Sequence, residues 1–171
     1  MFARVDFSKL AMMDALDLAI LIEDEAFERY VTFAEQIGRR YVGDAASVFQ
    51  SMSVNERKHG EQLLERRRKM FGDKPRTVTR DDVFDVEAPD LGAVRQNMST
   101  LEALNVSLEA EKKAYAFYDR ALEHMVDPEV RKLFVELRDE ETEHVQLISD
   151  AIAKLPPEAA QGLEDLDRDE A

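Results

Sequence analysis

Apolar residues recur at steps of three and four along most of the chain, which is the period of an amphipathic helix. Glycine and proline interrupt this pattern at a few places only, and these places divide the chain into four long segments. The first predicted helix covers about 14–37 and stops at Gly38; the second follows the N-cap Asp44 and continues to Phe71, before Gly72. The pattern predicts an all-α protein.

Two further start signals define the helices of the second half. Ser99-x-x-Glu102 is a capping-box pattern that opens the third helix. Asp127 followed by Pro128 combines an N-cap with a proline at the first helical position, and the fourth helix then extends to about Leu155.

The connections between these helices differ greatly in length. The first and third connections are short, so each joins antiparallel neighbours. The second spans 73–98, contains Pro75 and Pro89, and shows no clear period. Helices of about 24 residues are about 36 Å long, so this link can cross the whole bundle and return the third helix parallel to the second. The prediction is a ferritin-like four-helix bundle, two antiparallel hairpins joined by a long crossover, over residues 1–155.

Composition narrows the possible chemistry. The chain has 171 residues, no cysteine and a net charge of −14. Thiolate metal sites and thiol catalysis are therefore excluded, and the negative charge opposes binding to nucleic acid or to an anionic membrane. The longest uncharged apolar stretch, 18–22, is too short to cross a bilayer, and a cytoplasmic location is expected. Residues 156–171 are acidic, begin with Pro156-Pro157, and are expected to form a disordered tail.

Each predicted helix carries a glutamate in the middle of its apolar stripe. Two of these glutamates are followed by a histidine three residues later, which places both side chains on one face of the helix. The residues are Glu23, Glu56, His59, Glu111, Glu141 and His144. Their distances from the turns place the four carboxylates at one level of the bundle. Buried carboxylates without compensation cost several kcal/mol, so a dinuclear cation centre is predicted.

The chain also repeats itself. Glu23-x-x-Ala26-Phe27-x-x-Tyr30 matches the segment that begins at Glu111 and runs through Ala114 and Tyr115 to Tyr118, position for position. The duplicated pattern places Tyr115, like Tyr118, on the apolar stripe that faces the bundle axis.

These motifs resemble the rubrerythrin and bacterioferritin branch of the ferritin-like superfamily, whose pattern is Glu-x6-Tyr followed by Glu-x-x-His, twice. The resemblance covers about residues 15–155. It implies two bridging carboxylates, two terminal carboxylates and one nitrogen from each histidine, which are Glu56 and Glu141, Glu23 and Glu111, and His59 and His144, respectively. It also implies that Tyr30 and Tyr118 donate hydrogen bonds to the carboxylates.

The sequence departs from the best-known rubrerythrins in two respects. It lacks the four cysteines of a rubredoxin domain, and Ala114 stands where those proteins have an additional glutamate. The resulting symmetric ligand set is more similar to that of a bacterioferritin. The tail is a poor match for the fifth helix of bacterioferritin cages, so a storage shell is not expected.

The resemblance implies a non-haem dimetal oxidoreductase with two iron ions, for which manganese or zinc could substitute. It would reduce hydrogen peroxide or dioxygen, in oxidative-stress defence or iron handling, with electrons from an external donor protein or reductant. A homodimer is expected, with or without exchanged hairpins. The basic run 66–69 complements the dipole of the second helix, or alternatively docks an acidic redox partner. The alternatives are a ferroxidase, an iron-binding or delivery protein without turnover, and an interaction module with a vestigial site.

Overall fold

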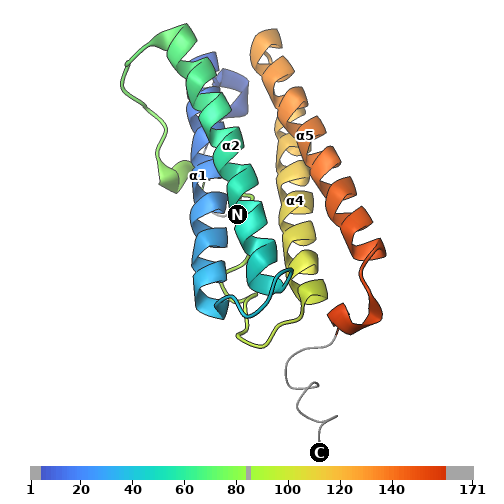
Figure 1. The fold of residues 1–171 in the computed structure, drawn as a ribbon. Coiled ribbons are helices and arrows are strands. Elements are labelled where there is room, and N and C mark those ends of the chain that lie inside the picture. Colours follow the sequence, from blue (N-terminus) through green and yellow to red (C-terminus); the bar gives the residue numbers. More distant parts are fainter. Residues whose placement is uncertain (1–4, 84–85, 161–171) are drawn as a thin grey trace, which may run out of the picture.

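Four long helices dominate the structure, a computed structural model that describes residues 5–83 and 86–160 (Figure 1). They are α1 (Met12–Ile37), α2 (Ala45–Phe71), α4 (Thr100–Leu122) and α5 (Pro128–Ala153). Three short elements accompany them: η1 (Phe7–Lys9), α3 (Arg80–Val83) and η2 (Pro157–Ala160). Every element in these described ranges is helical, which confirms the all-α prediction.

The helix ends lie close to the residues that the sequence indicates. The Asp44 carboxylate accepts a hydrogen bond from the backbone N–H of Ser47 at the start of α2. At the start of α4, Ser99 and Glu102 form both hydrogen bonds of a capping box. Asp127 caps α5 in the same way as Asp44 caps α2. These local bonds satisfy N–H groups that have no partner within the helix, so they define where each helix begins.

The helices are connected as two hairpins and one crossover. α1 packs along α2, and α4 packs along α5. α2 and α4 run in the same direction, and the chain between them returns along the full length of the bundle (Figure 1). α2 also contacts α4, and α1 contacts α5, which joins the hairpins into one bundle. This is the predicted ferritin-like topology.

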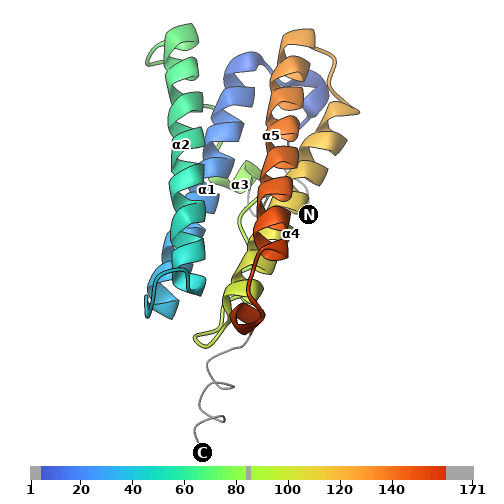
Figure 2. The same cartoon turned by 45° about the vertical axis from the view of Figure 1, so that its right-hand side comes forward.

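Part of the crossover has regular secondary structure. It contains the short helix α3, which the sequence pattern does not predict, and Figure 2 shows the crossover passing behind the bundle as viewed there. The chain turns inward at the end of α3, where Val83 is buried, and Val86 and Ala88 beyond it are buried as well. A helix-free surface link would leave such residues exposed, so this part of the crossover belongs to the core.

The beginning of the crossover is fixed by a buried ion pair. The guanidinium of Arg67 contacts both carboxylate oxygens of Asp17, at 2.9 and 3.1 Å. It also donates hydrogen bonds to the backbone carbonyls of Gly72 and Lys74, just beyond the end of α2. The run 66–69 is therefore not the continuous basic patch that the sequence indicated, because Arg67 is 4% exposed.

A layer of buried glutamates, called the polar layer below, separates two apolar clusters of the core; its helical residues are Glu23, Glu56, Glu111 and Glu141. One cluster contains Leu16, Ile20 and Phe134, and the other contains Phe33 and Phe49. The stripe pattern wrongly placed one residue of α4 in the core, since Tyr115 is 37% exposed. Ala114 occupies the buried position beside it, because helical residues one step apart lie about 100° apart around the axis.

The C-terminal region lies partly within the described part of the chain. η2 packs against α4, so residues 157–160 of the acidic segment have a defined conformation. The rest of the predicted disordered tail, residues 161–171, lies outside the described residues. Among the helices described, none is both long and apolar enough to cross a membrane.

Candidate metal centre

The four helical glutamates of the predicted centre converge in the polar layer. Each comes from a different long helix, and each is at most 2% exposed: Glu23, Glu56, Glu111 and Glu141. The central position of each glutamate in its helix explains this convergence, because the hairpin turns lie at similar distances from all four.

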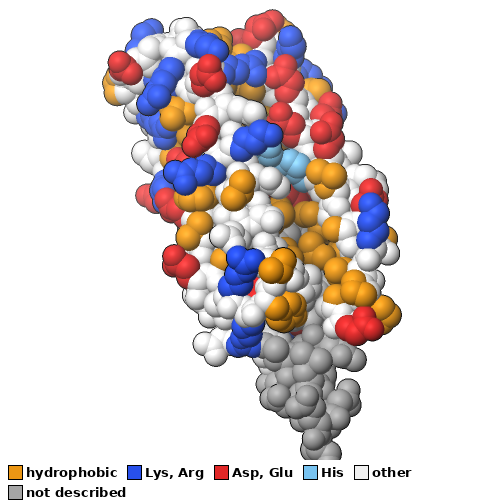
Figure 3. Space-filling view, viewed as in Figure 1, with side chains coloured by type: hydrophobic (Ala, Val, Ile, Leu, Met, Phe, Trp, Pro, Cys, Tyr) orange, Lys and Arg blue, Asp and Glu red, His pale blue; other side chains and the backbone are white. Residues whose placement is uncertain are grey.

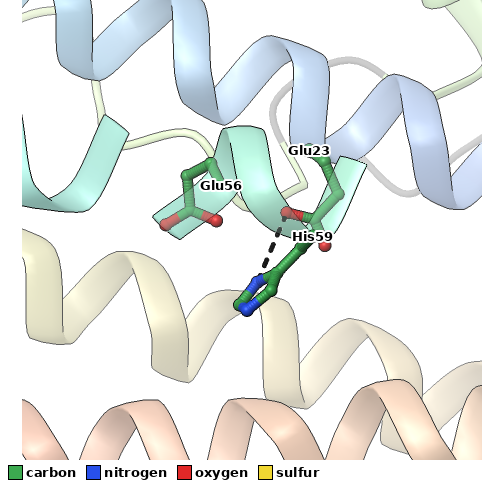
Figure 4. Close-up of side chains that lie close together, drawn as sticks. All are labelled: Glu23, Glu56 and His59. Atoms are coloured by element: carbon green, nitrogen blue, oxygen red, sulfur yellow. Dashed lines mark ion pairs between the residues drawn. The ribbon is translucent and has the colours of Figure 1, made fainter. Parts of the chain in front are cut away.

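The first half of the centre comes from α1 and α2. Glu23, Glu56 and His59 each offer a ligand atom within 4.8 Å of the other two. Figure 4 shows the three side chains gathered around a common space, with His59 Nδ1 4.0 Å from Glu23 Oε2. The three-residue spacing on α2 produces this arrangement, because it sets Glu56 and His59 one turn apart on one face.

The second half repeats this geometry on α4 and α5. Glu111, Glu141 and His144 again offer ligand atoms within 4.8 Å of one another. His144 Nδ1 lies 3.0 Å from a Glu111 oxygen and 3.6 Å from a Glu141 oxygen. All six side chains predicted as ligands are thus arranged as two Glu–Glu–His groups.

The two histidines join the halves on one side of the layer. The rings of His59 and His144 stack with their centroids 4.8 Å apart and their planes at 4°. Both side chains are partly exposed, and Figure 3 shows histidine at the molecular surface. A surface pocket of about 170 Å³ adjoins His59 and is also lined by Arg66 and Leu137. Solvent can therefore approach the centre from the histidine side.

A fifth carboxylate, which the sequence analysis missed, enters the layer from the crossover. Glu87 is 1% exposed, and its oxygens lie within 4.8 Å of ligand atoms of Glu56 and Glu111. The set of buried carboxylates is therefore not symmetric. Glu87 follows no helical period and stands in an acidic link, so the only sequence signal for its burial was the apolar Val86 and Ala88 on either side.

Burial dominates the electrostatics of these carboxylates. It raises the pKa of Glu23, Glu56 and Glu141 well above the usual value, and the negative charge of Glu87 is the next cause for all three. Burial, followed by the charge of Glu111, raises the pKa of Glu87 to about 7. A cation in this layer would reverse these shifts, because it favours the ionised form of each carboxylate.

The pKa values of the two histidines shift in opposite directions. Burial, followed by repulsion from His144, lowers the pKa of His59 to about 4. Burial also opposes the charged form of His144, but its hydrogen bond to Glu111 and the charge of that residue outweigh burial and raise the pKa. His59 is therefore neutral at neutral pH, which is the form that binds metal ions.

The two predicted tyrosines lie fully inside the bundle. Tyr30 and Tyr118 are 0% exposed, and burial raises the pKa of both phenols well above the usual value. Charges within the polar layer contribute further, first Glu111 for Tyr30 and Glu87 for Tyr118. Neither hydroxyl makes a hydrogen bond of ordinary geometry to a described residue, so the predicted bonds to the carboxylates are not formed.

The donor atoms of the layer fit a dinuclear cation centre. Seven buried carboxylate oxygens have no hydrogen-bond partner among the described residues: Glu23 Oε2, both oxygens of Glu56, both oxygens of Glu87, Glu111 Oε1 and Glu141 Oε2. Buried polar atoms of native proteins are nearly always paired. Oxygen and imidazole donors in this combination suit iron or manganese, and cations at two adjacent positions would satisfy the unpaired oxygens.

Solved structures of similar fold include proteins from the following three organisms. An uncharacterised conserved protein from Magnetospirillum magnetotacticum is 28% identical, with a TM-score of 0.64 over 86% of this chain and 97% of the other. A bacterioferritin from Rhodobacter capsulatus is 17% identical, with a TM-score of 0.53 over 82% of each chain. A hypothetical protein from Pyrococcus furiosus is 22% identical, with a TM-score of 0.52 over 87% of this chain and 94% of the other.

The last two similarities concern the fold alone, and they support the ferritin-like topology. No protein of curated function matches the chain significantly. The sequence does match the rubrerythrin family, over residues 14–152. Since that match includes all four long helices almost completely, and both Glu–Glu–His groups, the chain belongs to the rubrerythrin family of ferritin-like dimetal-carboxylate proteins.

Proposed function

We propose that this protein is a non-haem diiron oxidoreductase that reduces hydrogen peroxide. The observation that carries the proposal is the pair of Glu–Glu–His groups, which lie side by side in a buried layer where seven carboxylate oxygens accept no hydrogen bond from the described residues. The predicted ligands are Glu23, Glu56, His59, Glu111, Glu141 and His144. Manganese or zinc could occupy the same donors.

Two bound Fe(II) ions would supply the two electrons that convert hydrogen peroxide and two protons into two water molecules, leaving two Fe(III) ions. The chain's own contribution is to hold the ligands in place and to limit access. The apolar clusters on both sides of the polar layer, with Tyr30 and Phe49 on one side and Phe134 on the other, keep bulk water away along the bundle axis.

Access for the oxidant is proposed to run along the histidine side. The pocket of about 170 Å³ beside His59 admits a molecule as small as peroxide. The polar side chains of Arg66 and Glu136, which form an ion pair at 2.8 Å, stand at its rim. Protons for the reaction would arrive from solvent by the same route.

The electrons must come from outside these 171 residues, because the chain contains no cysteine for a thiolate redox centre. An external donor protein or small reductant would return the irons to Fe(II). The protein would act as a homodimer, and its role would be oxidative-stress defence or iron handling.

Stopped-flow oxidation of the Fe(II)-loaded protein tests this proposal. Loading is done without oxygen, and separate samples are mixed with hydrogen peroxide and with dioxygen. A much faster reaction with peroxide is expected. Faster oxidation by dioxygen would identify a ferroxidase instead, and iron binding without oxidation by either reagent would identify an iron-binding or delivery protein.

A further inference from the structure

We propose that Glu87 is a fifth carboxylate ligand of the dinuclear centre, supplied by the crossover rather than by a long helix. The inference rests on the metal centre of the proposed function, and it adds a residue that neither the helix pattern nor the repeat contains. Glu87 comes to the polar layer from the segment that follows α3.

The first observation is that the carboxyl group of Glu87 is buried. Glu87 is 1% exposed, and neither of its carboxylate oxygens accepts a hydrogen bond from an N–H or hydroxyl group of the described residues; its one hydrogen-bonding neighbour is the carboxyl group of Glu56, another residue of the layer. An acidic residue with a merely structural role would be expected to accept hydrogen bonds, since an unpaired buried carboxylate destabilises the fold. Both oxygens of Glu87 are instead left available to a cation.

The second observation is the position of Glu87 between the two Glu–Glu–His groups. Ligand atoms of Glu87, Glu56 and Glu111 lie within 4.8 Å of one another. Glu56 belongs to the Glu–Glu–His group of α1 and α2, whereas Glu111 belongs to the group of α4 and α5. Glu87 therefore lies between the two halves, where a carboxylate can reach a metal ion in either half.

The backbone next to Glu87 is held firmly from two sides. Lys113 of α4 donates a hydrogen bond of 2.7 Å to the carbonyl oxygen of Ala88. Arg29 of α1 donates a hydrogen bond of 2.7 Å to the carbonyl oxygen of Pro89, and it also pairs with Glu25. These bonds connect the crossover to both hairpins, so the Glu87 carboxylate is presented from a fixed backbone.

The direction of approach distinguishes Glu87 from the histidines. Its neighbours in the crossover are attached to α1 and α4, whereas His59 and His144 come from α2 and α5. The centre would thus have imidazole ligands on its solvent-accessible side and a carboxylate on the side that the crossover covers. A fifth carboxylate would also add negative charge beside the two metal ions, which favours their higher oxidation state.

Cobalt binding to Glu87→Gln tests this assignment without any turnover. Co²⁺ is titrated into the metal-free full chain, and its visible absorption reports both the affinity and the ligand set. The control is Asp90→Asn, which removes a carboxylate from the same segment but outside the layer, because the Asp90 side chain is 81% exposed. Circular dichroism establishes that each variant is folded.

Wild type and Asp90→Asn should each bind about two Co²⁺ ions per chain with the same spectrum. Glu87→Gln should show a changed spectrum and about ten-fold weaker binding, or more, of at least one ion. Binding to Glu87→Gln with wild-type affinity and an unchanged spectrum would overturn the inference while leaving the dinuclear centre intact. Failure of the wild type itself to bind Co²⁺ would overturn the proposed function as well.

A second measurement does not depend on the variant being folded. In a crystal structure of the Co²⁺-loaded wild-type chain, an oxygen of Glu87 should lie at bonding distance from a metal ion. A Glu87 side chain that points away from both ions would contradict the proposal.

Discussion

The buried glutamates lower the stability of the metal-free chain. Their side chains lie close together in a buried layer, and the negative charge of each raises the pKa of others. Glu56 is 0% exposed, and neither of its oxygens accepts a hydrogen bond from an N–H or hydroxyl group within the described ranges, as expected for a residue of a cation-binding site.

Metal binding should therefore stabilise the protein strongly. At a free metal concentration about 100 times the dissociation constant, the free energy of unfolding should rise by about 2.7 kcal/mol. Glu56→Gln keeps the shape of the side chain but removes its charge, so it should unfold at a higher temperature than wild type without metal and gain much less from metal.

Thermal unfolding with and without Co²⁺ measures both effects. Glu61→Gln is the matched control, because Glu61 lies on the same helix and its side chain is 71% exposed. Equal stabilisation of Glu56→Gln and Glu61→Gln by Co²⁺ would show that Glu56 does not contribute to metal binding.

The stability of the metal-free protein should also depend on pH. The pKa of Glu87 is raised to about 7, whereas an unfolded glutamate titrates near about 4.3. The folded state therefore binds more protons, and the stability from this group is full at low pH and is lost as the pH rises through about 7. The lowered pKa of His59 acts in the opposite direction, but only between about 4 and 6.5.

Between about pH 6.5 and 8 the free energy of unfolding of the metal-free chain should therefore fall as the pH rises. Urea denaturation at several pH values measures this slope, and Glu87→Gln should reduce it. A free energy that increases with pH over this interval would contradict the assignment of raised pKa values to the buried carboxylates.

At the scale of single residues, the sequence was informative wherever helical periodicity applied. The six predicted ligands converge because the Glu-x-x-His spacing and the distances to the turns are fixed by helix geometry. Glu87 could not be found in this way, because its position depends on the path of a link without a period. Tyr115 was wrongly predicted to face the bundle axis, because a stripe with steps of three and four residues does not distinguish Tyr115 from the adjacent Ala114.

At the scale of elements, the crossover has the largest effect on the site. It is joined to the helices at its start by Arg67 and in its middle by Arg29 and Lys113. The helix caps could be predicted, since they depend on a few adjacent residues. The inward turn of the crossover could not, because it depends on hydrogen bonds between residues such as Arg29 and Pro89, which are 60 positions apart.

The two adjacent arginines at the end of α2 should differ sharply in their contribution to stability. Arg67→Met leaves the buried carboxylate of Asp17 without its main partner and should lower the free energy of unfolding by about 3–5 kcal/mol. Arg66→Met breaks a partly exposed ion pair with Glu136 and should cost less than about 1 kcal/mol.

Urea denaturation of the two variants provides the comparison. Similar losses for Arg66→Met and Arg67→Met would mean that the ion pair between Asp17 and Arg67 has no special role in holding the crossover.

At the scale of the whole molecule, solvent can reach the proposed metal centre from one side of the bundle, and the crossover covers the opposite side. The opening lies on the side of α2 and α5, beside the histidines, and the crossover covers the side of α1 and α4. The sequence predicted the ferritin-like topology because a link spanning 73–98 is long enough to traverse the bundle. It could not predict the asymmetry of the site, which depends on the path of that link.

A chain without its own thiolate redox centre should complete one turnover and then stop. The Fe(II)-loaded protein should consume about one hydrogen peroxide per dinuclear centre, because two irons supply two electrons. Continued consumption should require an added reductant, and peroxide assays with and without ascorbate measure the difference. Sustained turnover in the absence of any donor would indicate a different reaction, such as disproportionation of peroxide.

The ratio of metal to chain tests the central claim most directly. The protein is reconstituted with Fe(II) without oxygen, freed of unbound metal, and analysed for iron and protein content. The structure predicts about two irons per chain, and fewer in Glu56→Gln and Glu141→Gln. Less than about one metal ion per wild-type chain after reconstitution would contradict the existence of a dinuclear centre.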